Sequence, residues 1–291
     1  MANLSAANQL NTQDFMHAID MLGIGGADVC IHASIKSFGA PLQCGLAGIS
    51  DAFLQKDCTI LVPSFSDLFE AAPAPPYMPL QNGAGDYSYF RRKSYANAQP
   101  FDPSSKEIST DEMGIFPKHI LEDARSIRGN HPLNSFTALG RHAHALVHTQ
   151  TPCDVYAPLK QLCAAGGYIL LMGVGLNRAT ILHYAEQIAG RRPFIRWSFD
   201  RNGEIMPVSA GGCSEGFACF RPVLRRYAKS IRVANSEWHC YKAAEMVERC
   251  AAAIRTNPHM THCADAHCDR CRDAIRGGPL LDAVLRARGF H

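Results

Sequence analysis

Three residues spaced three positions apart, Thr180, His183 and Glu186, form the set in this sequence that is best suited to chemistry. They lie in NRATILHYAE, a pattern typical of a helix, and residues three apart share one face of a helix. A carboxylate beside an imidazole fixes the tautomer of the ring and makes the ring more basic. A general base for an amine or alcohol nucleophile requires this pairing. The ordinary alternative is a partly buried histidine that pairs with a nearby glutamate.

Two further polar segments precede this helix. GNHPLNSFTALG, at residues 129–140, places His131 directly before a proline, which favours an extended backbone, and Ser135 then suits a turn. HASIKSFG, at residues 32–39, follows a predicted strand, and its hydroxyls, N–H groups and Lys36 suit a phosphate or pyrophosphate. Plain loop architecture explains either segment equally well when each is taken alone.

Near the end of the chain, Cys263, Cys268 and Cys271 form a C-x4-C-x2-C cluster. The short C-x2-C turn lets two thiolates reach one tetrahedral metal, and Cys263 would be a third ligand. Cys213 is the first choice for the fourth, because the Gly-Gly pair before it lets its backbone approach closely. The spacing favours a structural zinc, since four closed ligands leave no position for chemistry. Three rivals remain for the fourth position: Cys240, His259 and His262.

The elements that must position these residues alternate between helix and strand. Segments 58–65 and 168–173 are nearly all apolar, which is typical of strands buried on both faces of a parallel sheet. Strand, helix and strand in that order indicate a crossover unit. We therefore expect an α/β fold with a central, mostly parallel sheet that is flanked by helices.

Two later segments depart from that pattern. FIRWSFDRNGEIMPVS, at residues 194–209, predicts an antiparallel hairpin with its turn at Asn202–Gly203. From Ser230 onward the sequence predicts a mostly helical part, which carries the cysteine cluster. We expect a single domain over residues 1–291, with residues 230–291 as a helical C-terminal extension.

Composition and charge exclude several classes of protein. The 291 residues carry a net charge of +3, which is too small and too dispersed for a dedicated nucleic-acid-binding protein. The N-terminus lacks the pattern of a signal peptide, and the longest apolar run, around residues 168–176, is far shorter than a membrane span. We therefore expect a cytoplasmic protein whose twelve cysteines are thiols or metal ligands rather than disulfides.

Taken together, these segments resemble the aminoglycoside 3-N-acetyltransferase family. The matching pieces are HASIKSFG, TILVPSF, MGIFPKHILEDARSIRGNHPLNSFTALG and YILLMGVGLNRATILHYAE, and they span roughly residues 12–235. The linked motifs H-P-x-x-S-F-x-A-x-G and T-x-x-H-x-x-E are the most specific part. The resemblance implies an α/β enzyme that uses acetyl-coenzyme A. Such an enzyme transfers the acyl group to an amine by direct attack in a ternary complex.

The resemblance also implies roles for particular residues. His183 would be the general base, oriented by Glu186, with Thr180 close by. His131 and Ser135 would line the same cleft. The coenzyme A site would comprise His32, Ser34, Lys36, Ser37, Phe38, Gly39, Met113 and Gly114.

The identity of the acceptor stays open at this stage. Aminoglycosides are polycations whose pockets need several carboxylates, and the irregular segment over residues 67–103 supplies few acids. A different amine metabolite therefore fits at least as well, and a role in antibiotic resistance is implied by the family alone. Cationic residues lie in the stretches expected to border the cleft: Arg91, Arg92, Lys93, Arg191, Arg192 and Arg196.

Two rival functions remain. One is a metal-dependent hydrolase with His131, His183 and Glu186 as ligands, and the other is a non-enzymatic, zinc-bearing binding module. As partners we expect a small-molecule amine and an acyl-coenzyme A, with neither nucleic acid nor membrane. The sequence does not fix the oligomeric state, for which a homodimer is one option.

Overall fold

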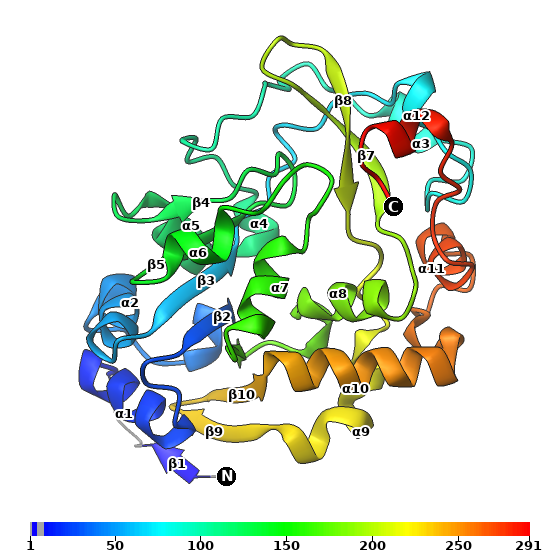
Figure 1. Ribbon diagram of the computed structural model, residues 1–291. Helices are drawn as coiled ribbons and strands as arrows, with labels where there is room; N and C mark the ends of the chain where they lie inside the picture. Colours follow the sequence, from blue (N-terminus) through cyan, green and yellow to red (C-terminus); the bar gives the residue numbers. More distant parts are fainter. Residues whose placement is uncertain (1, 5–8) are drawn as a thin grey trace.

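The computed structural model describes residues 2–4 and 9–291, and its centre is a mixed sheet of eight strands (Figure 1). The order across the sheet is β1-β9-β10-β6-β2-β3-β5-β4. The strands are β1 Ala2–Leu4, β2 Asp28–Ala33, β3 Thr59–Pro63, β4 Ile127–Arg128, β5 Phe136–Leu139, β6 Tyr168–Met172, β9 Lys229–Val233 and β10 Ser236–Lys242.

The middle of this sheet is parallel, antiparallel pairs flank it on both sides, and β1 joins β9 in parallel at one edge. β2 pairs in parallel with β3 and β6, so that Cys30 lies between Leu61 and Ile169. These are the nearly all-apolar strands, and burial on both faces explains their composition. The α/β class is confirmed. The sheet is mixed rather than mostly parallel, because the β4–β5 and β9–β10 hairpins add antiparallel pairs on both sides of its parallel centre.

Helices cover both faces of the sheet, and each face has its own apolar core (Figure 1). Successive residues of a strand point to opposite faces. Cys30 therefore joins the core under α8, whereas Ile31 joins the core under α1. On one face lie α1 Thr12–Leu22, α2 Gly45–Gln55 and α5 Ile115–Glu122, and on the other α6 Ala143–Val147, α7 Ala157–Ala164, α8 Ile181–Ile188 and α10 Ala243–Thr256.

A separate hairpin stands beyond the central strands, as the sequence predicts (Figure 1). It consists of β7 Phe194–Phe199 and β8 Ile205–Ala210, with Gly203 at a φ of 79° in its turn. Only a residue without a side chain adopts this left-handed conformation readily. Two short helices, α3 Ser88–Arg92 and α4 Thr110–Met113, lie in and just after the irregular segment.

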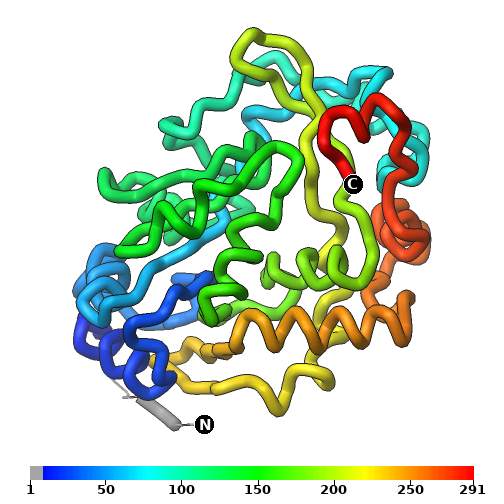
Figure 2. Tube along the Cα trace, in the orientation of Figure 1, coloured from blue at the N-terminus to red at the C-terminus, as the bar shows by residue number. Residues whose placement is uncertain are grey.

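The helical C-terminal part begins at Ala243 rather than near Ser230, because β9 and β10 take the preceding residues into the sheet. Later helices are α11 Asp269–Ile275 and α12 Ala283–Ala287, and the short α9 Arg221–Leu224 precedes β9. The C-terminal segment then runs beside the segment around Leu80, whose carbonyl accepts a hydrogen bond from Leu280 N at 3.0 Å (Figure 2). None of the helices in the described ranges has the length and apolar character needed to span a bilayer.

Candidate active site

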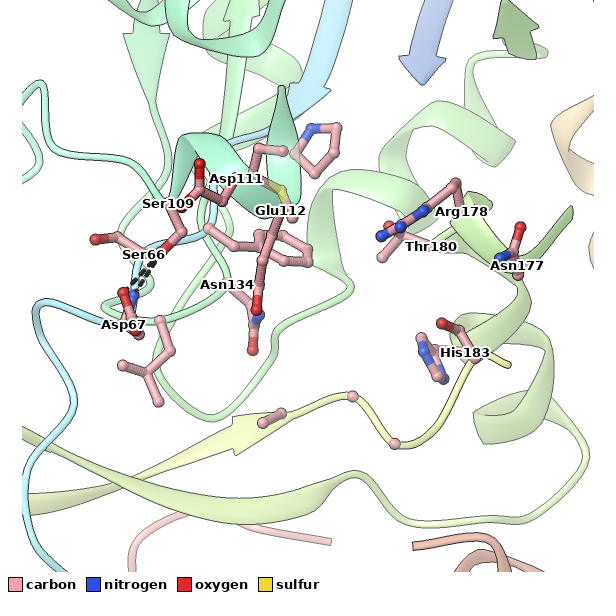
Figure 3. A pocket seen from close by; sticks show the side chains of 18 of the residues that line it. Ser66, Asp67, Ser109, Asp111, Glu112, Asn134, Asn177, Arg178, Thr180 and His183 are labelled. Atoms are coloured by element: carbon pink, nitrogen blue, oxygen red, sulfur yellow. Dashed lines mark hydrogen bonds between the residues drawn. The ribbon is translucent and has the colours of Figure 1, made fainter. Parts of the chain in front are cut away.

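An open cleft of about 1770 Å³ lies where the chain leaves the carboxyl ends of β2, β3 and β6. Loops after each strand line it, with Ser34 after β2, Ser66 after β3 and Gly175 after β6. Figure 3 shows two facing sides, with Glu112 on one and His183 on the other. Ligands of open α/β sheets bind at this end of the strands.

His183 and Glu186 form a hydrogen-bonded pair at this cleft. Nδ1 of His183 lies 2.7 Å from Oε2 of Glu186, as their spacing on α8 predicts. An ionised carboxylate can only accept, so Nδ1 carries the proton of the neutral ring and Nε2 keeps a free lone pair. Thr180 precedes the helix and lines the cleft, and its hydroxyl makes no capping hydrogen bond. An imidazole and a hydroxyl thus lie together at the cleft.

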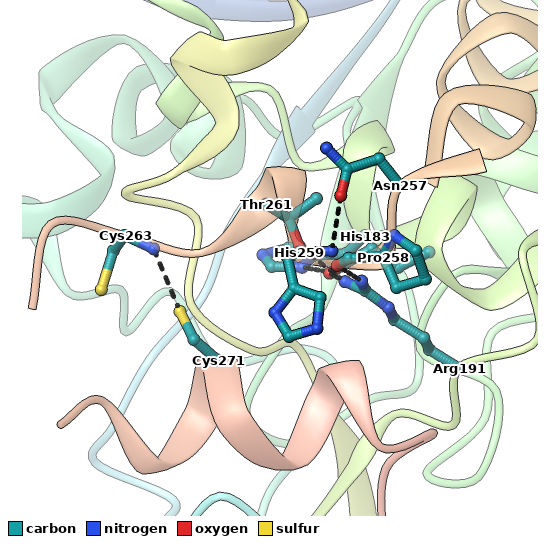
Figure 4. A network of polar contacts seen from close by, with 9 residues as sticks. His183, Arg191, Asn257, Pro258, His259, Thr261, Cys263 and Cys271 are labelled. Atoms are coloured by element: carbon teal, nitrogen blue, oxygen red, sulfur yellow. Dashed lines mark hydrogen bonds and ion pairs between the residues drawn. The ribbon is translucent and has the colours of Figure 1, made fainter. Parts of the chain in front are cut away.

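Arg191 holds the other oxygen of the Glu186 carboxylate. Its Nη1 donates to Oε1 of Glu186 at 2.5 Å and to Oγ1 of Thr261 at 2.7 Å, and its Nη2 donates to the carbonyl of Pro258 (Figure 4). Arg191 and Glu186 are both buried. The carboxylate behind His183 is therefore fixed to a segment some seventy residues later in the chain.

Two residues that sequence reasoning did not assign to the site fix the His183 ring. The ring of Tyr156 stacks on it with a centroid distance of 6.4 Å and an interplanar angle of 14°. Gly211 lies against its edge, because a Cβ atom there would be 3.2 Å from both His183 Cδ2 and Tyr156 Oη. The Gly-Gly pair is visible in the sequence, but sequence reasoning interprets it as a feature that lets Cys213 approach a metal rather than as space for the His183 ring.

Five of the residues predicted to bind coenzyme A line the cleft. Two segments meet there, since a Cβ on Gly114 would lie 3.8 Å from the carbonyl oxygen of Ala33. Burial lowers the pKa of His32 to about 4, so this ring is neutral at pH 7 and adds no charge. Lys36 is exposed and supplies the cation of its segment. The five are His32, Ser34, Lys36, Met113 and Gly114.

Ser37, Phe38 and Gly39 are not among the residues that line the cleft, and their role in binding coenzyme A stays a prediction. Phe38 is fully buried, with its ring 5.6 Å from that of Phe15. The Ser37 hydroxyl donates to Ser34 O at 2.6 Å, and Gly39 ends a short 3-10 helix at a φ of 61°. Phe38 therefore turns into the core after Lys36, whereas Ser37 is half-buried and Gly39 is exposed.

His131 and Ser135 do not line the cleft either, because both are fully buried. His131 Nε2 donates to Ser209 O at 2.8 Å, and its Nδ1 accepts from Asn134 N at 2.9 Å. The Ser135 hydroxyl accepts from Arg128 Nε at 2.8 Å. Their motif therefore shapes the loop, and Leu133 and Asn134 are the members that line the cleft.

The four predicted cysteines converge. The sulfur atoms of Cys213, Cys263, Cys268 and Cys271 all lie within 4.8 Å of one another, which includes the first choice for the fourth position. Within the described residues no other group of three or more such side chains has this geometry. No arrangement of His131, His183 and Glu186 as metal ligands is therefore present in that part of the chain, and the hydrolase alternative lacks support.

Charged groups of both signs line the cleft, and two of its acids come from α4 rather than from the irregular segment over residues 67–103. Asp111 and Glu112 at α4 lie across from Arg178 (Figure 3). Of the cationic residues expected at its border, Lys93 and Arg196 line the cleft. The others do not: Arg91, Arg92, Arg191 and Arg192. The loop that carries Cys268 also forms part of the wall, through Asp265, His267, Asp269 and Arg270.

Comparison with known proteins finds relatives that are similar in sequence to this chain. The sequence model described as aminoglycoside 3-N-acetyltransferase matches residues 30–271. Aminoglycoside N(3)-acetyltransferase VIII of Streptomyces fradiae is 28% identical over 204 residues, which are 67% of this chain and 65% of that protein. Aminoglycoside N(3)-acetyltransferase III of Serratia marcescens is 30% identical over 188 residues, 62% of this chain and 65% of its own. The aligned part thus spans just under two thirds of the length of these relatives.

Solved structures share the fold. The apoenzyme of aminoglycoside acetyltransferase AAC(3)-IVa superimposes with a TM-score of 0.74 at 21% identity, over 94% of this chain and 100% of that one. A structure of AAC-IIIb in binary complex with CoASH gives a TM-score of 0.69 at 20% identity, over 85% and 97% of the two chains.

Proposed function

This chain belongs to the aminoglycoside 3-N-acetyltransferase family, and on that premise we propose that it is an acyl-coenzyme A-dependent N-acyltransferase. The relatives carry the name of this activity, and one fold neighbour was solved with CoASH. The observation that carries the proposal is the single cleft in which His183 meets the loops of Ser34 and Met113. One wall is suited to the acyl donor and the other holds a base.

His183 is the proposed general base. An amine acceptor is mostly protonated at pH 7, and its nitrogen must lose a proton before or during attack. Nε2 of His183 takes that proton, while Glu186 and Arg191 keep the ring in place. The amine nitrogen then bonds to the thioester carbon, the C–S bond breaks, and the thiolate of coenzyme A leaves and is protonated. No protein residue becomes acylated.

The tetrahedral intermediate needs hydrogen-bond donors for its oxyanion. Thr180 is suited to this role because its hydroxyl is free of capping bonds and faces the cleft. The backbone N–H groups of Leu182 and His183, in the first turn of α8, already donate to the carbonyls of Ala179 and Thr180, so the Thr180 hydroxyl is the proposed donor. The proposed acceptor is an amine in general, either an aminoglycoside or another amine metabolite.

Coenzyme A release with a panel of amines, together with ligand-induced thermal shift, tests this function. Acetyl-coenzyme A should raise the melting temperature by mass action. His183→Ala and Glu186→Gln should each lower turnover at least ~100-fold, in line with loss of a general base, and both should keep the thermal shift. Near-wild-type turnover in both variants would contradict the base. No thermal shift at saturating ligand would instead favour a non-enzymatic binding module.

The cysteine cluster is proposed to hold one structural zinc ion. Four sulfur atoms around a tetrahedral zinc lie about 3.8 Å apart when each Zn–S bond is ~2.3 Å, and the observed limit of 4.8 Å fits. A zinc ion bound there would join Cys213, near Gly211, to the C-terminal segment of Cys263, Cys268 and Cys271. Its role is to stabilise that wall of the cleft, because all four positions are closed.

Metal analysis of the purified chain tests the zinc site. We expect about one zinc per chain, reduced in Cys268→Ser together with a lower melting temperature. Cys44→Ser is the matched control, since this half-buried thiol lies outside the cluster. Native protein without metal, or equal zinc in Cys268→Ser and wild type, would refute the site.

A further inference from the structure

Arg196 is a buried cation that lines the cleft without a carboxylate partner. It is 7% exposed, and its Nη1 donates to the carbonyls of Asn82 at 3.2 Å and Ile195 at 2.8 Å. Across residues 2–4 and 9–291, its Nε and Nη2 make no hydrogen bond and the guanidinium makes no ion pair. Burial lowers the pKa of Arg196 to about 10, so it stays cationic at neutral pH. Donors therefore remain available at the cleft.

Arg128 shows how a purely structural buried arginine differs. It is also 7% exposed, and burial lowers its pKa to about 10 as well. Yet its Nε, Nη1 and Nη2 donate to Ser135 Oγ, Ser105 O and Ser64 O, each at 2.8 Å. A buried charge is usually neutralised or fully hydrogen-bonded. All three nitrogens of Arg128 are hydrogen-bonded within the protein, whereas Nε and Nη2 of Arg196 are available for hydrogen bonds to a ligand.

A second guanidinium, that of Arg270, reaches the same part of the cleft from the start of α11, just after Cys268. Gly83, at a φ of 59°, lies between β7 and α11, because a Cβ there would be 2.8 Å from the Phe194 ring and 3.0 Å from Arg270 Cγ. Arg270 is exposed and lines the cleft. Burial is the main cause that lowers the pKa of Arg196; the nearby Glu70 carboxylate raises it, and the charge of Arg270 lowers it further.

The carboxylates around these two arginines are already engaged. Glu70 is 8% exposed and pairs with Lys93. Asp269 pairs with Arg272 at 2.6 Å, and Asp265 accepts from the backbone N–H of its neighbour His267 at 2.9 Å. No described carboxylate forms an ion pair with either cleft-lining arginine.

The β7–β8 hairpin connects the surroundings of His183 to the position of Arg196. Phe194 pairs with Ala210, which directly precedes the glycine that touches the His183 ring. Arg196 is two residues further along β7, or about 6.6 Å at the usual rise of a strand. Side chains two apart share a face, so Arg196 and Phe194 point the same way. A ligand several bonds long can reach both His183 and Arg196.

We propose that the acyl acceptor carries an anionic group, a carboxylate or a phosphate, that Arg196 and Arg270 bind while its amine lies at His183. This inference rests on the proposed acyltransferase function and names the class of its acceptor. Arginine binds both groups through parallel, charge-assisted hydrogen bonds. The rings of Phe90 and Phe194, at 4.8 and 5.5 Å from the guanidinium carbon of Arg196, hold it in place.

Matched amines with and without the anion test the proposal. We compare 5-aminopentanoate with 5-aminopentanamide, and 5-aminopentyl phosphate with 5-aminopentan-1-ol, by coenzyme A release. Wild type should favour the acid of at least one pair by about 10- to 100-fold in kcat/KM, the range of charge-assisted hydrogen bonds. The pair with the larger ratio identifies carboxylate or phosphate. A ratio near 1 for both pairs would overturn the proposal.

Substitutions of the two arginines test whether they cause the preference for the anionic amine. In Arg196→Gln and Arg270→Gln the ratio should fall toward 1, and the exposed Arg270 can be replaced without disturbing the core. Arg226→Gln is the control, because this exposed arginine also lies over an aromatic ring, at 4.9 Å from that of Tyr227, but outside the cleft. An undiminished ratio in both cleft variants would assign the preference elsewhere and refute the site.

A binding measurement separates this proposal from the acyltransferase function. Inorganic phosphate and glutarate are titrated into the acetyl-coenzyme A complex by calorimetry. At least ~10-fold weaker binding in Arg196→Gln than in wild type supports the anion site even if no test amine is acylated. Equal binding in the two proteins refutes it. Failure to bind acetyl-coenzyme A would refute the parent function, while the anion titration of the free protein still tests the arginines.

Discussion

The loop that carries His131 and the helix that carries His183 each hold a buried histidine, but the two rings differ in how many of their nitrogens are hydrogen-bonded within the protein. Both nitrogens of His131 are used within the protein, one by Ser209 and the other by Asn134. His183 has one nitrogen engaged, by Glu186, and the other without a partner in the described residues. His131 is fully buried away from the cleft, whereas His183 is 9% exposed and lines it.

This contrast teaches that burial alone does not distinguish structural from functional polar groups. What differs is whether the protein itself satisfies every donor and acceptor of the side chain. A saturated group fixes the backbone around it. A group with one free nitrogen, held by its other nitrogen, is oriented for a reaction and still able to react.

The largest expected effect comes from removing each histidine in turn. His183→Ala should lower kcat at least ~100-fold, and it should destabilise the fold by about 1 to 3 kcal/mol because one oxygen of the buried Glu186 carboxylate loses its partner. His131→Ala should destabilise the fold by about 2 to 4 kcal/mol, because it leaves the buried carbonyl of Ser209 and the partly buried N–H of Asn134 unpaired. Urea unfolding and coenzyme A release measure both quantities. Equal losses of kcat in the two variants would remove the distinction.

A pH series sharpens the structural half of the comparison. Burial lowers the pKa of His131 to about 4, whereas an unfolded histidine has a pKa of about 6.5. Between these values the unfolded chain binds the proton and the folded chain does not, so stability falls as the pH falls. From pH 7.5 to 5 this histidine should contribute a loss of about 2 kcal/mol, roughly 30-fold in the unfolding equilibrium.

The measurement is the difference between wild type and His131→Ala at each pH. Wild type should lose about 2 kcal/mol more than the variant over that range, because the other titrating groups are common to both. Parallel curves would show that this ring is not kept neutral by the fold. The acid-sensitive stability would then have to arise elsewhere, and His32 is the next group to replace, since burial lowers its pKa to about 4 as well.

Sequence reasoning reached the parts of the site that depend on local spacing. The His183–Glu186 pair follows from the period of a helix, and the convergence of the cysteines follows from a short turn plus a Gly-Gly pair. It failed where the partner is remote. The motif around His131 is polar enough to suggest a ligand, but its partners are Ser209 and Arg128, which only the packing of β8 and β4 brings near.

The fold shows the same limit. The apolar strands at the centre of the sheet are evident from composition, but β9 and β10 alternate polar and apolar residues and join through Ala234, which has a φ of 49°. Their sequence lacks the Asn-Gly turn that identified the β7–β8 hairpin. Likewise, the position of Arg196 at the cleft depends on the register of β7, which sequence pattern does not fix.

Replacing Arg191 tests whether orientation behind His183 matters for the chemistry. Arg191→Gln should lower kcat about 10-fold with KM changed less than about 3-fold, because the Glu186 carboxylate loses the group that fixes it and no substrate contact is removed. Arg191→Lys should restore part of the rate through its charge. The control is the exposed neighbour, Arg192→Gln. A rise in KM with an unchanged kcat would make Arg191 a binding residue instead.

The smallest expected effect concerns the space beside the His183 ring. In Gly211→Ala the new Cβ would lie 3.2 Å from His183 Cδ2, so the ring or the loop must move by a few tenths of an ångström. Displacement of a reacting group by about 1 Å costs about 100-fold, and we therefore expect a loss of about 3-fold in kcat. Gly25→Ala, where the nearest contact is 3.7 Å and remote from the cleft, is the control. Because Ala at 211 adds no charge and removes no hydrogen bond, a loss restricted to kcat would show that the ring needs both its carboxylate and its packing to act as a base.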